Sequence, residues 1–272
     1  MERKEIIRNA QMAQLSIMDR IHELCQKHQL TYYLIGGTAL GAIRHKGFIP
    51  WDVDIDIAMP RKDYELFVYK YSEELAPHIR CNNFKNTKNY WQPHATAVLE
   101  NSKLVLRYDE LNGIDRKVYI DIMPLDNVPS NRFLRSYQKR TILFIRKIKK
   151  IKNIKYYPSN SKTTRLMKKI IFLLLYPFSF KMLNNWLDKT MSMSKKNYGY
   201  LCSMASHFSY DKQTFANEVY GTAKLMDFEE KKYCVPSQIE YYLKRLYGDY
   251  MKLPPISVQE EQMEFIKDVQ LW

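Results

Sequence analysis

The sequence lacks any long apolar run, and its four cysteines are scattered. In the 272 residues the longest apolar run, 170–178, reaches about half of the roughly 20 residues that cross a membrane as a helix. No CxxC motif or other paired cysteine spacing occurs, which argues against a disulfide scaffold or a zinc ribbon. The first residues contain no apolar region typical of a signal peptide, so we expect a cytoplasmic protein.

Glycine is scarce, and several familiar catalytic motifs are missing. None of the motifs GxSxG, GxGxxG, HExxH or Walker A occurs, which leaves no basis for a hydrolase triad or a P-loop kinase. The chain has only eight glycines, yet four of them lie between positions 36 and 47. Because glycine allows unusual backbone conformations and the close approach of a ligand, we predict the functional site there.

Acidic residues are absent between Asp126 and Asp188. This segment holds 15 of the 43 Lys and Arg residues, which leaves 28 against 29 Asp and Glu in the rest of the chain. The net charge of +14 therefore comes from one segment, which also has apolar clusters at 142–145 and 170–175. A basic and apolar surface favours contact with anionic membrane lipids, but it also fits nucleic acid or a merely solvated face.

The spacing of apolar residues predicts an α/β (α+β) fold with helices that flank a sheet. Helical spacing indicates helices over 5–28, 38–45, 62–75 and 238–247. Alternating or β-branched runs indicate strands over 31–35, 53–59 and 118–123, the last closed by Pro124, with three short strands between 79 and 108. We divide the chain into an α/β catalytic core (1–128), a basic helical insertion (129–198) and a C-terminal segment that returns to the core (199–272).

Three aspartates alternate with apolar residues in the segment DVDID at 52–56. In a strand this period places the carboxylates on one face, about 6.5–7 Å apart at Cα. Like charges so close cost free energy unless a cation neutralises them, although an exposed edge strand with solvated aspartates is the alternative. Carboxylates combined with substrate phosphate oxygens suit Mg²⁺ or Mn²⁺. We therefore predict a metal site at Asp54 and Asp56, with Asp121 as third ligand and Asp126 in reserve.

The turn Gly36-Gly37-Thr38 lies between a predicted strand and a predicted helix, with Thr38 as the N-cap. Backbone N–H groups at a helix N-terminus bind anions, here the phosphates of a donor. The cationic side chains that follow on the same helix would also bind phosphate, although surface positions explain them equally well. Our further candidates for substrate contacts are Arg44, His45, Trp51, His94 and Asp126.

The segment LIGGTALGAIRHKGFIPWDVDIDI at 34–57 strongly resembles the LicD family. The match continues at 59–64 (MPRKDY), 120–126 (IDIMPLD) and 247–255 (YGDYMKLPP), so it extends over most of the chain. The family usually has a further acidic residue where Val53 stands. Because the strand period directs Val53 toward the core, we expect activity to survive this difference. The role of Asp52 stays open.

The resemblance implies a nucleotidyltransferase-like fold and a metal-dependent transferase. Such an enzyme would move a phospho-substituent, phosphocholine first, from CDP-choline or a CDP-alditol to a hydroxyl of a cell-surface glycan or its lipid-linked precursor. The acceptor hydroxyl would attack phosphorus and release CMP, with Asp121 as candidate proton acceptor. By position, the residues implied are Asp54, Asp56 and Asp121 for Mg²⁺ or Mn²⁺, and Gly36, Gly37 and Thr38 for donor phosphate.

Other functions stay open. A phosphoribitol or phosphoglycerol transferase of the same family differs only in its donor, and a true nucleotidyltransferase would use the same metal site. A nucleic-acid-binding protein is suggested by the net charge alone and would show a steep salt dependence, so we expect no nucleic acid partner. We expect a peripheral location at the inner face of the plasma membrane, where segment 129–198 would contact anionic lipids.

Overall fold

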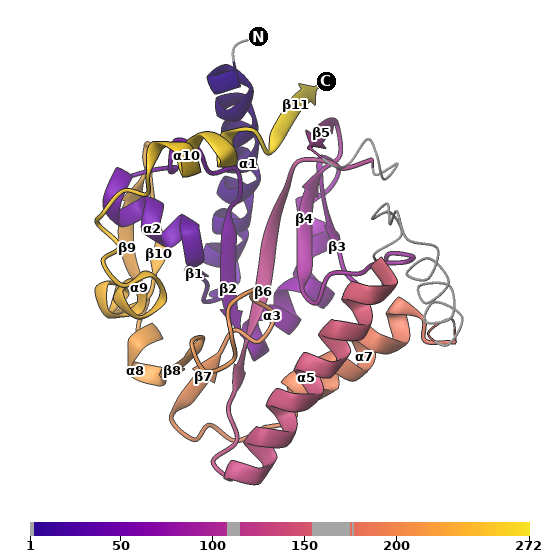
Figure 1. Ribbon diagram of the computed structural model, residues 1–272. Coiled ribbons are helices and arrows are strands. Elements are labelled where there is room, and N and C mark those ends of the chain that lie inside the picture. Colours follow the sequence, from indigo (N-terminus) through magenta and orange to yellow (C-terminus); the bar gives the residue numbers. More distant parts are fainter. Residues whose placement is uncertain (1–2, 108–114, 154–174, 176) are drawn as a thin grey trace, which may run out of the picture.

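The computed structural model describes residues 3–107, 115–153, 175 and 177–272, and a mixed sheet lies at its centre (Figure 1). The strands of this sheet are β1 (Tyr33–Leu34), β2 (Asp56–Pro60), β3 (Ile79–Asn82), β4 (Ala95–Leu99), β6 (Tyr119–Asn127), β7 (Tyr200–Cys202) and β8 (Thr214–Ala216). They follow the order β1-β2-β6-β4-β3, with β7 paired to the end of β6 and β8 to β7. β2 and β6 run parallel, whereas the other pairs of this sheet are antiparallel.

The first helix, α1 (Arg3–Lys27), packs against β4 and β6. Its apolar residues recur at helical spacing, and Ile17 and Ile21 are fully buried by this packing. The buried Gln14 donates hydrogen bonds to the carbonyls of Val53 (2.7 Å) and Tyr119 (3.1 Å). The helix thereby holds the acidic segment before β2 against the start of β6.

A second group of elements lies beside β1 and β2 (Figure 1). Its members are α2 (Gly36–His45), α8 (Asn217–Tyr220), the hairpin of β9 (Lys224–Phe228) and β10 (Lys231–Val235), α9 (Ile239–Tyr247) and α10 (Ile256–Met263). A Cβ on Gly41 would collide with the Gly47 carbonyl oxygen, and one on Gly47 would collide with Glu229. Gly41 is therefore needed for close backbone packing, whereas Gly47 meets only the Glu229 side chain.

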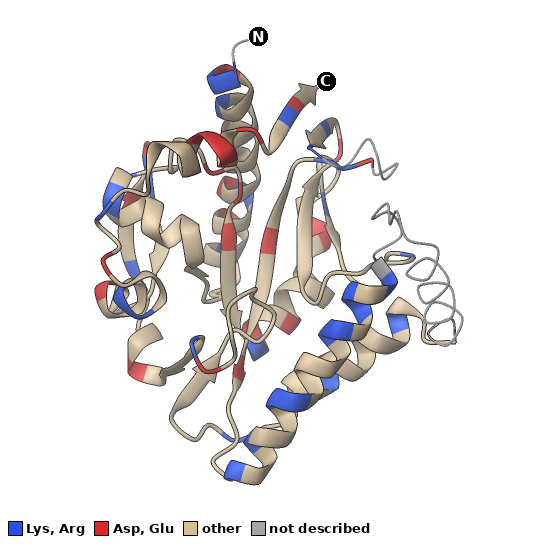
Figure 2. Cartoon of the chain, viewed as in Figure 1, with Lys and Arg blue, Asp and Glu red and all other residues tan. Residues whose placement is uncertain are grey.

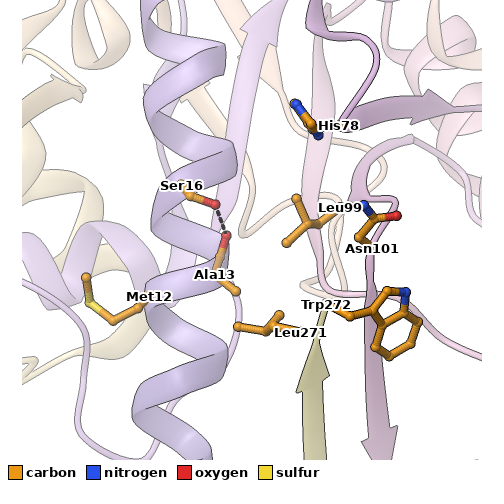
Figure 3. A pocket seen from close by; sticks show the side chains of 8 residues that line it. All are labelled: Met12, Ala13, Ser16, His78, Leu99, Asn101, Leu271 and Trp272. Carbon is orange, nitrogen blue, oxygen red and sulfur yellow. Dashed lines mark hydrogen bonds between the residues drawn. The ribbon is translucent and has the colours of Figure 1, made fainter.

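The C-terminal strand β11 (Ile266–Leu271) pairs with β5 (Ser102–Leu106) in a separate ladder. Next to it, a cavity of about 660 Å³ lies between α1, the β4–β5 turn and the C-terminus (Figure 3). Its described lining consists of Met12, Ala13, Ser16, His78, Leu99, Asn101, Leu271 and Trp272. Because no Asp, Glu, Lys or Arg is among these residues, this cavity does not provide the charges that phosphate chemistry needs.

Part of the basic segment forms two packed helices, α5 (Arg132–Asn153) and α7 (Phe180–Met191), with blue Lys and Arg bands along them in Figure 2. Their contact buries Ile145 of α5 and Leu183 of α7 completely. Residues 170–174 of the predicted apolar cluster at 170–175, and several of the basic residues, lie in 154–174, outside the described residues. No helix in the described part of the chain is both long and apolar enough to cross a membrane.

The predicted α+β class is confirmed, with three local differences. β6 does not end at Pro124: this proline lies beyond Ile122, the last residue that β4 pairs with, so its missing N–H disturbs no bond to β4. The helix predicted over 62–75 is α-helical only in α3 (Arg61–Leu66) and continues as π and 3₁₀ turns to Leu75. The helix predicted over 238–247 is present as α9, but it is not the last element, because α10 and β11 follow it. The division into 1–128, 129–198 and 199–272 stays a prediction.

Candidate active site

The parallel pairing of β2 and β6 brings two of the predicted carboxylates together. Asp56 and Asp121 are register partners, and the Asp121 N–H donates to the Ile55 carbonyl (3.1 Å). Register partners on neighbouring strands direct their side chains to the same face of a sheet. Asp54 precedes β2, which starts three residues later than predicted. The period of a strand therefore does not explain how Asp54 reaches the site.

The helix α2 begins at Gly36, two residues earlier than predicted, and Thr38 is not its N-cap. The N-cap is Ile35, which provides no side-chain hydrogen bond. The Thr38 hydroxyl instead accepts from the Asp56 N–H (2.9 Å) and donates to the Asp54 carbonyl (3.4 Å). Thr38 thus joins the first turn of α2 to the acidic segment, while the helix N-terminus, uncapped by a side chain, suits an anion.

Gly36 and Gly37 permit close approach at this turn. Gly36 has a φ of +56°, which favours glycine, and its N–H donates to the Tyr242 hydroxyl (3.1 Å). A Cβ on Gly37 would stand 2.6 Å from an oxygen of Asp52. The Asp52 carboxylate therefore lies against the first turn of α2, where the helix dipole favours negative charge and where we predict donor phosphate.

A cavity of about 570 Å³ opens over this turn. The predicted residues in its lining are Gly37, Thr38, Arg44, Trp51, Asp54 and Asp56. The remaining polar or aromatic lining comes from Asp52, His207, Tyr247, Asp249, Tyr250, Lys252 and Gln262. The tertiary structure thus combines the 36–56 segment with residues almost two hundred positions further along the chain.

The other predicted residues lie outside this lining. Gly36 begins α2 but is not part of the lining, and the His45 ring packs edge-on against Trp51, with 5.9 Å between ring centroids. Nε2 of His94 lies 3.0 Å from Oδ1 of Asp121; the His94 side chain is buried and the Asp121 side chain is half-buried. Their orientation does not satisfy a hydrogen bond, so Asp121 Oδ1 has no hydrogen-bond partner among the described residues.

Asp126 is not brought into the cavity. Its two carboxylate oxygens accept from Arg61 at 2.7 Å each, and Arg61 also pairs with Asp188 (2.8 Å). Burial raises the pKa of Asp126, while the charge of Arg61 opposes this effect. Since its charge is already compensated within the protein, Asp126 is not positioned to serve as the reserve ligand.

The carboxylates of the cavity repel one another. Burial raises the pKa of Asp56 well above its usual value, and the charges of Asp121, Asp54 and Asp52 raise it further. Burial also raises the pKa of Asp52 strongly, with Asp54 adding to the effect. Asp54 opens onto the cavity, yet the protein around it withdraws enough water to raise its pKa, and Asp121 raises it further. A proton or a bound cation would relieve this repulsion.

The donor set suits a divalent cation that is shared with a substrate. A cation would compensate the mutual repulsion and the Asp121 oxygen, which accepts no hydrogen bond from the described residues. Within the described residues, however, no three His, Cys, Asp or Glu side chains are grouped so as to hold a metal ion by themselves. Mg²⁺ is often held by only one or two carboxylates plus phosphate oxygens and water. The metal site stays a prediction, with Asp54 and Asp56 as the ligands that line the cavity.

His207 and the segment 247–255 were not among the predicted site residues. Burial lowers the pKa of His207, and the nearby Asp54 opposes this effect. Arg146 of α5 donates to the carbonyl of Ser206 and so fixes the chain next to His207. The segment 247–255 carried a signal as part of the LicD resemblance, but no local pattern indicated that it faces the acidic turn.

Comparison with known proteins supports the resemblance to the LicD family. A family model described as LicD/FKTN/FKRP, nucleotidyltransferase domain, matches residues 29–158, which include α2, β2 and β6. The lipopolysaccharide cholinephosphotransferase LicD of Haemophilus influenzae is 28% identical over 256 residues, 93% of this chain and 94% of that protein. The chain is similar to the LicD family over these residues.

Shorter matches agree with this resemblance. Uncharacterised proteins of Rickettsia prowazekii and Rickettsia typhi are each 45% identical over 47 residues, 17% of this chain. In those proteins the match covers 18% and 15% of the length. The resemblance that the sequence motifs indicated is thereby confirmed at the level of the family.

Proposed function

We propose that this chain is a phosphotransferase that moves phosphocholine from CDP-choline to a hydroxyl of a cell-surface glycan or its lipid-linked precursor. The observation that carries the proposal is the cavity in which Asp54 and Asp56 lie beside the first turn of α2. Similarity to the Haemophilus influenzae cholinephosphotransferase along 93% of the chain supports phosphocholine as the transferred group.

The diphosphate of the donor would bind at the first turn of α2. The uncapped helix N-terminus and the Arg44 guanidinium, which also donates to the Tyr250 carbonyl (2.9 Å), are suited to phosphate. Asp54 and Asp56 would hold Mg²⁺ or Mn²⁺. When bound, the cation supplies positive charge against the diphosphate and the leaving phosphate.

The reaction is a substitution at phosphorus. The acceptor hydroxyl oxygen bonds to the phosphorus that carries choline, the bond from this phosphorus to the bridging oxygen breaks, and CMP leaves. The hydroxyl proton passes to a carboxylate of the site. Asp121 is our candidate acceptor because it is the register partner of Asp56 on the neighbouring strand.

Release of CMP tests this function directly. The purified protein is incubated with Mg²⁺, a membrane extract as acceptor, and either CDP-choline, CDP-ribitol or CDP-glycerol. We expect CMP release with CDP-choline only, its loss in EDTA, and incorporation of labelled choline into the glycan fraction. CMP release from an alditol donor alone would reassign the transferred group, and incorporation of a nucleotide from CTP or ATP would overturn the proposal.

We also propose that α5 and α7 contact anionic lipids of the cytoplasmic leaflet. The side chains of Phe133, Tyr137 and Phe144 on α5 are 55–75% exposed. Exposed basic residues follow them along the same helix at helical spacing, so they lie on the same face. Trp186 of α7, 40% exposed, contacts Phe144 with 6.2 Å between ring centroids, so the helices share one surface. We define the docking face as Phe133, Tyr137, Arg140, Phe144, Lys147, Lys150, Lys181 and Trp186.

Two lysines that the sequence assigned to this surface are turned away from it. Lys149 is buried and donates to Asn184 Oδ1, and burial lowers its pKa to about 7. Lys152 donates to the Leu175 carbonyl (2.8 Å). The docking face therefore contains fewer positive charges than the 15 Lys and Arg residues of the basic segment. Exposed aromatic rings, which insert at a lipid interface, complement these charges. Salt-sensitive sedimentation with phosphatidylglycerol vesicles would support this contact, and equal binding to neutral vesicles would contradict it.

A further inference from the structure

The cavity carries an aromatic group beside its acidic turn. Trp51 comes from the loop before the aspartates, Tyr247 is the last residue of α9, and Tyr250 follows two residues after Gly248. The Tyr247 hydroxyl lies 3.9 Å from where a Cβ on Gly36 would stand, so this ring reaches the first turn of α2. Three aromatic side chains therefore line the same cavity as the carboxylates.

The electrostatic setting of this group favours a cation. Tyr247 lines the cavity together with the carboxylates of Asp52, Asp54 and Asp56. A further carboxylate, Asp249, lines the same region. The adjoining wall is apolar and consists of Leu253, Pro254 and Pro255.

We propose that Trp51, Tyr247 and Tyr250 form the subsite for the trimethylammonium group of the choline donor. This inference rests on the proposed phosphocholine transfer. A quaternary ammonium has no N–H to donate, so it is recognised by aromatic faces, by apolar contacts to its methyl groups and by negative charge. All three occur together here. A neutral cytosine ring would stack on the same aromatic side chains, but it carries no positive charge for the carboxylates to attract.

The position of the subsite agrees with the chemistry. Only an ethylene group separates the choline nitrogen from the ester oxygen on the reacting phosphorus. The ammonium site must therefore adjoin the phosphate site, and the contact between Tyr247 and the first turn of α2 meets this requirement. Arg44 and Lys252 in the same cavity suit the phosphates instead of the ammonium group.

Ligand binding by variants with and without the aromatic ring tests the subsite. Calorimetry with Mg²⁺ compares CDP-choline, CDP-ethanolamine and CMP on the wild type and on Tyr250→Leu and Tyr250→Phe, with Tyr247→Leu and Tyr247→Phe as a second pair. We expect each Leu variant to lose about 2- to 30-fold in affinity for CDP-choline, the range of a cation–π contact. The Phe variants should keep most of that affinity, and CMP affinity should be unchanged in all of them.

The outcomes separate the subsite from the proposed function. An equal loss of CMP and CDP-choline affinity in the Leu variants would assign the rings to the cytidine and overturn the subsite. Unchanged CDP-choline affinity in both Leu variants would also overturn it, while CDP-choline binding by the wild type would leave the proposed transfer intact. No binding of CDP-choline by the wild type, with CMP still bound, would overturn both.

Discussion

The acidic cavity and the basic docking face both gather charges of one sign, but in different surroundings. In the cavity, protein withdraws water from the aspartates, and their pKa values rise together. On the docking face, Arg140, Lys147 and Lys150 are exposed, and water and salt screen their repulsion. The cavity carboxylates therefore affect one another's pKa values and require a bound cation or a proton. The surface charges are independent of one another, and each contributes a small amount to lipid binding.

The strongest test of this comparison removes one cavity charge. Asp54→Asn or Asp56→Asn should lower the transfer rate by at least about 100-fold, because each removes an anionic metal ligand while keeping its shape. Circular dichroism should show an unchanged fold, and without metal the variants should be at least as stable as the wild type, since repulsion is reduced. Near-normal transfer at saturating Mg²⁺ in either variant would rule out the metal assignment.

Asp126 is a buried acid whose charge Arg61 already compensates. Removing Arg61 should therefore destabilise the fold, whereas removing a cavity carboxylate should not. Arg61→Met leaves Asp126 buried without its partner and should lower the free energy of unfolding by about 3–5 kcal/mol. The control is Arg80→Met, which breaks the Arg80–Glu100 pair where Arg80 is 61% exposed, and should cost less than about 1 kcal/mol. Urea unfolding of both variants measures the difference, and equal effects would contradict the role given to burial.

Access to the helix N-terminus gives a third test. Gly37→Val would place a branched side chain against Asp52 and over the first turn of α2. We expect CDP-choline affinity to fall about 10- to 100-fold, the equivalent of one charged hydrogen bond. Gly37→Ala, whose methyl group meets only the movable Asp52 side chain, should lose less. Calorimetry that finds unchanged donor affinity in the Val variant would exclude phosphate binding at this turn.

Neutralising the docking face should have a smaller and graded effect. Replacing Arg140, Lys147, Lys150 and Lys181 with Gln should weaken binding to anionic vesicles at least about tenfold, since each basic residue near the surface contributes on the order of 1 kcal/mol. The matched control replaces four exposed lysines on other elements with Gln: Lys62, Lys103, Lys224 and Lys244. Equal losses in the two variants would attribute vesicle binding to net charge alone, and transfer to a short soluble glycan should be unchanged in both.

The smallest expected effect concerns pH. The pKa of Asp56 is raised in the folded chain, so the folded chain binds this proton more tightly than the unfolded chain. Its contribution to stability is therefore complete below about pH 3.9 and is lost as the pH rises through the folded-state pKa. Without metal, the melting temperature of the wild type relative to Asp56→Asn should fall as the pH rises. A constant difference between pH 5 and 8 would contradict the raised pKa.

Local sequence patterns predicted the positions of helices and strands better than they predicted which side chains contact one another. The α1, α2 and β2 positions followed from apolar spacing, because such periods reflect which side chains a helix or strand buries. The N-cap assignment of Thr38 failed because its hydroxyl bonds to the acidic segment and not to its own helix. Asp126 was misjudged because Arg61, its partner, lies 65 positions away in the sequence.

The sequence by itself determined the resemblance to the LicD family, the α+β class and the carboxylates and glycines of the candidate site, since these depend on residue type and short spacing. Only the tertiary structure decided which of them share a cavity. Parallel pairing set Asp121 beside Asp56, and the chain beyond Gly248 supplied Tyr250 to the wall. Burial likewise took Lys149 out of the basic surface. Contacts between distant segments depend on how whole faces pack together, and no local pattern of residues records them.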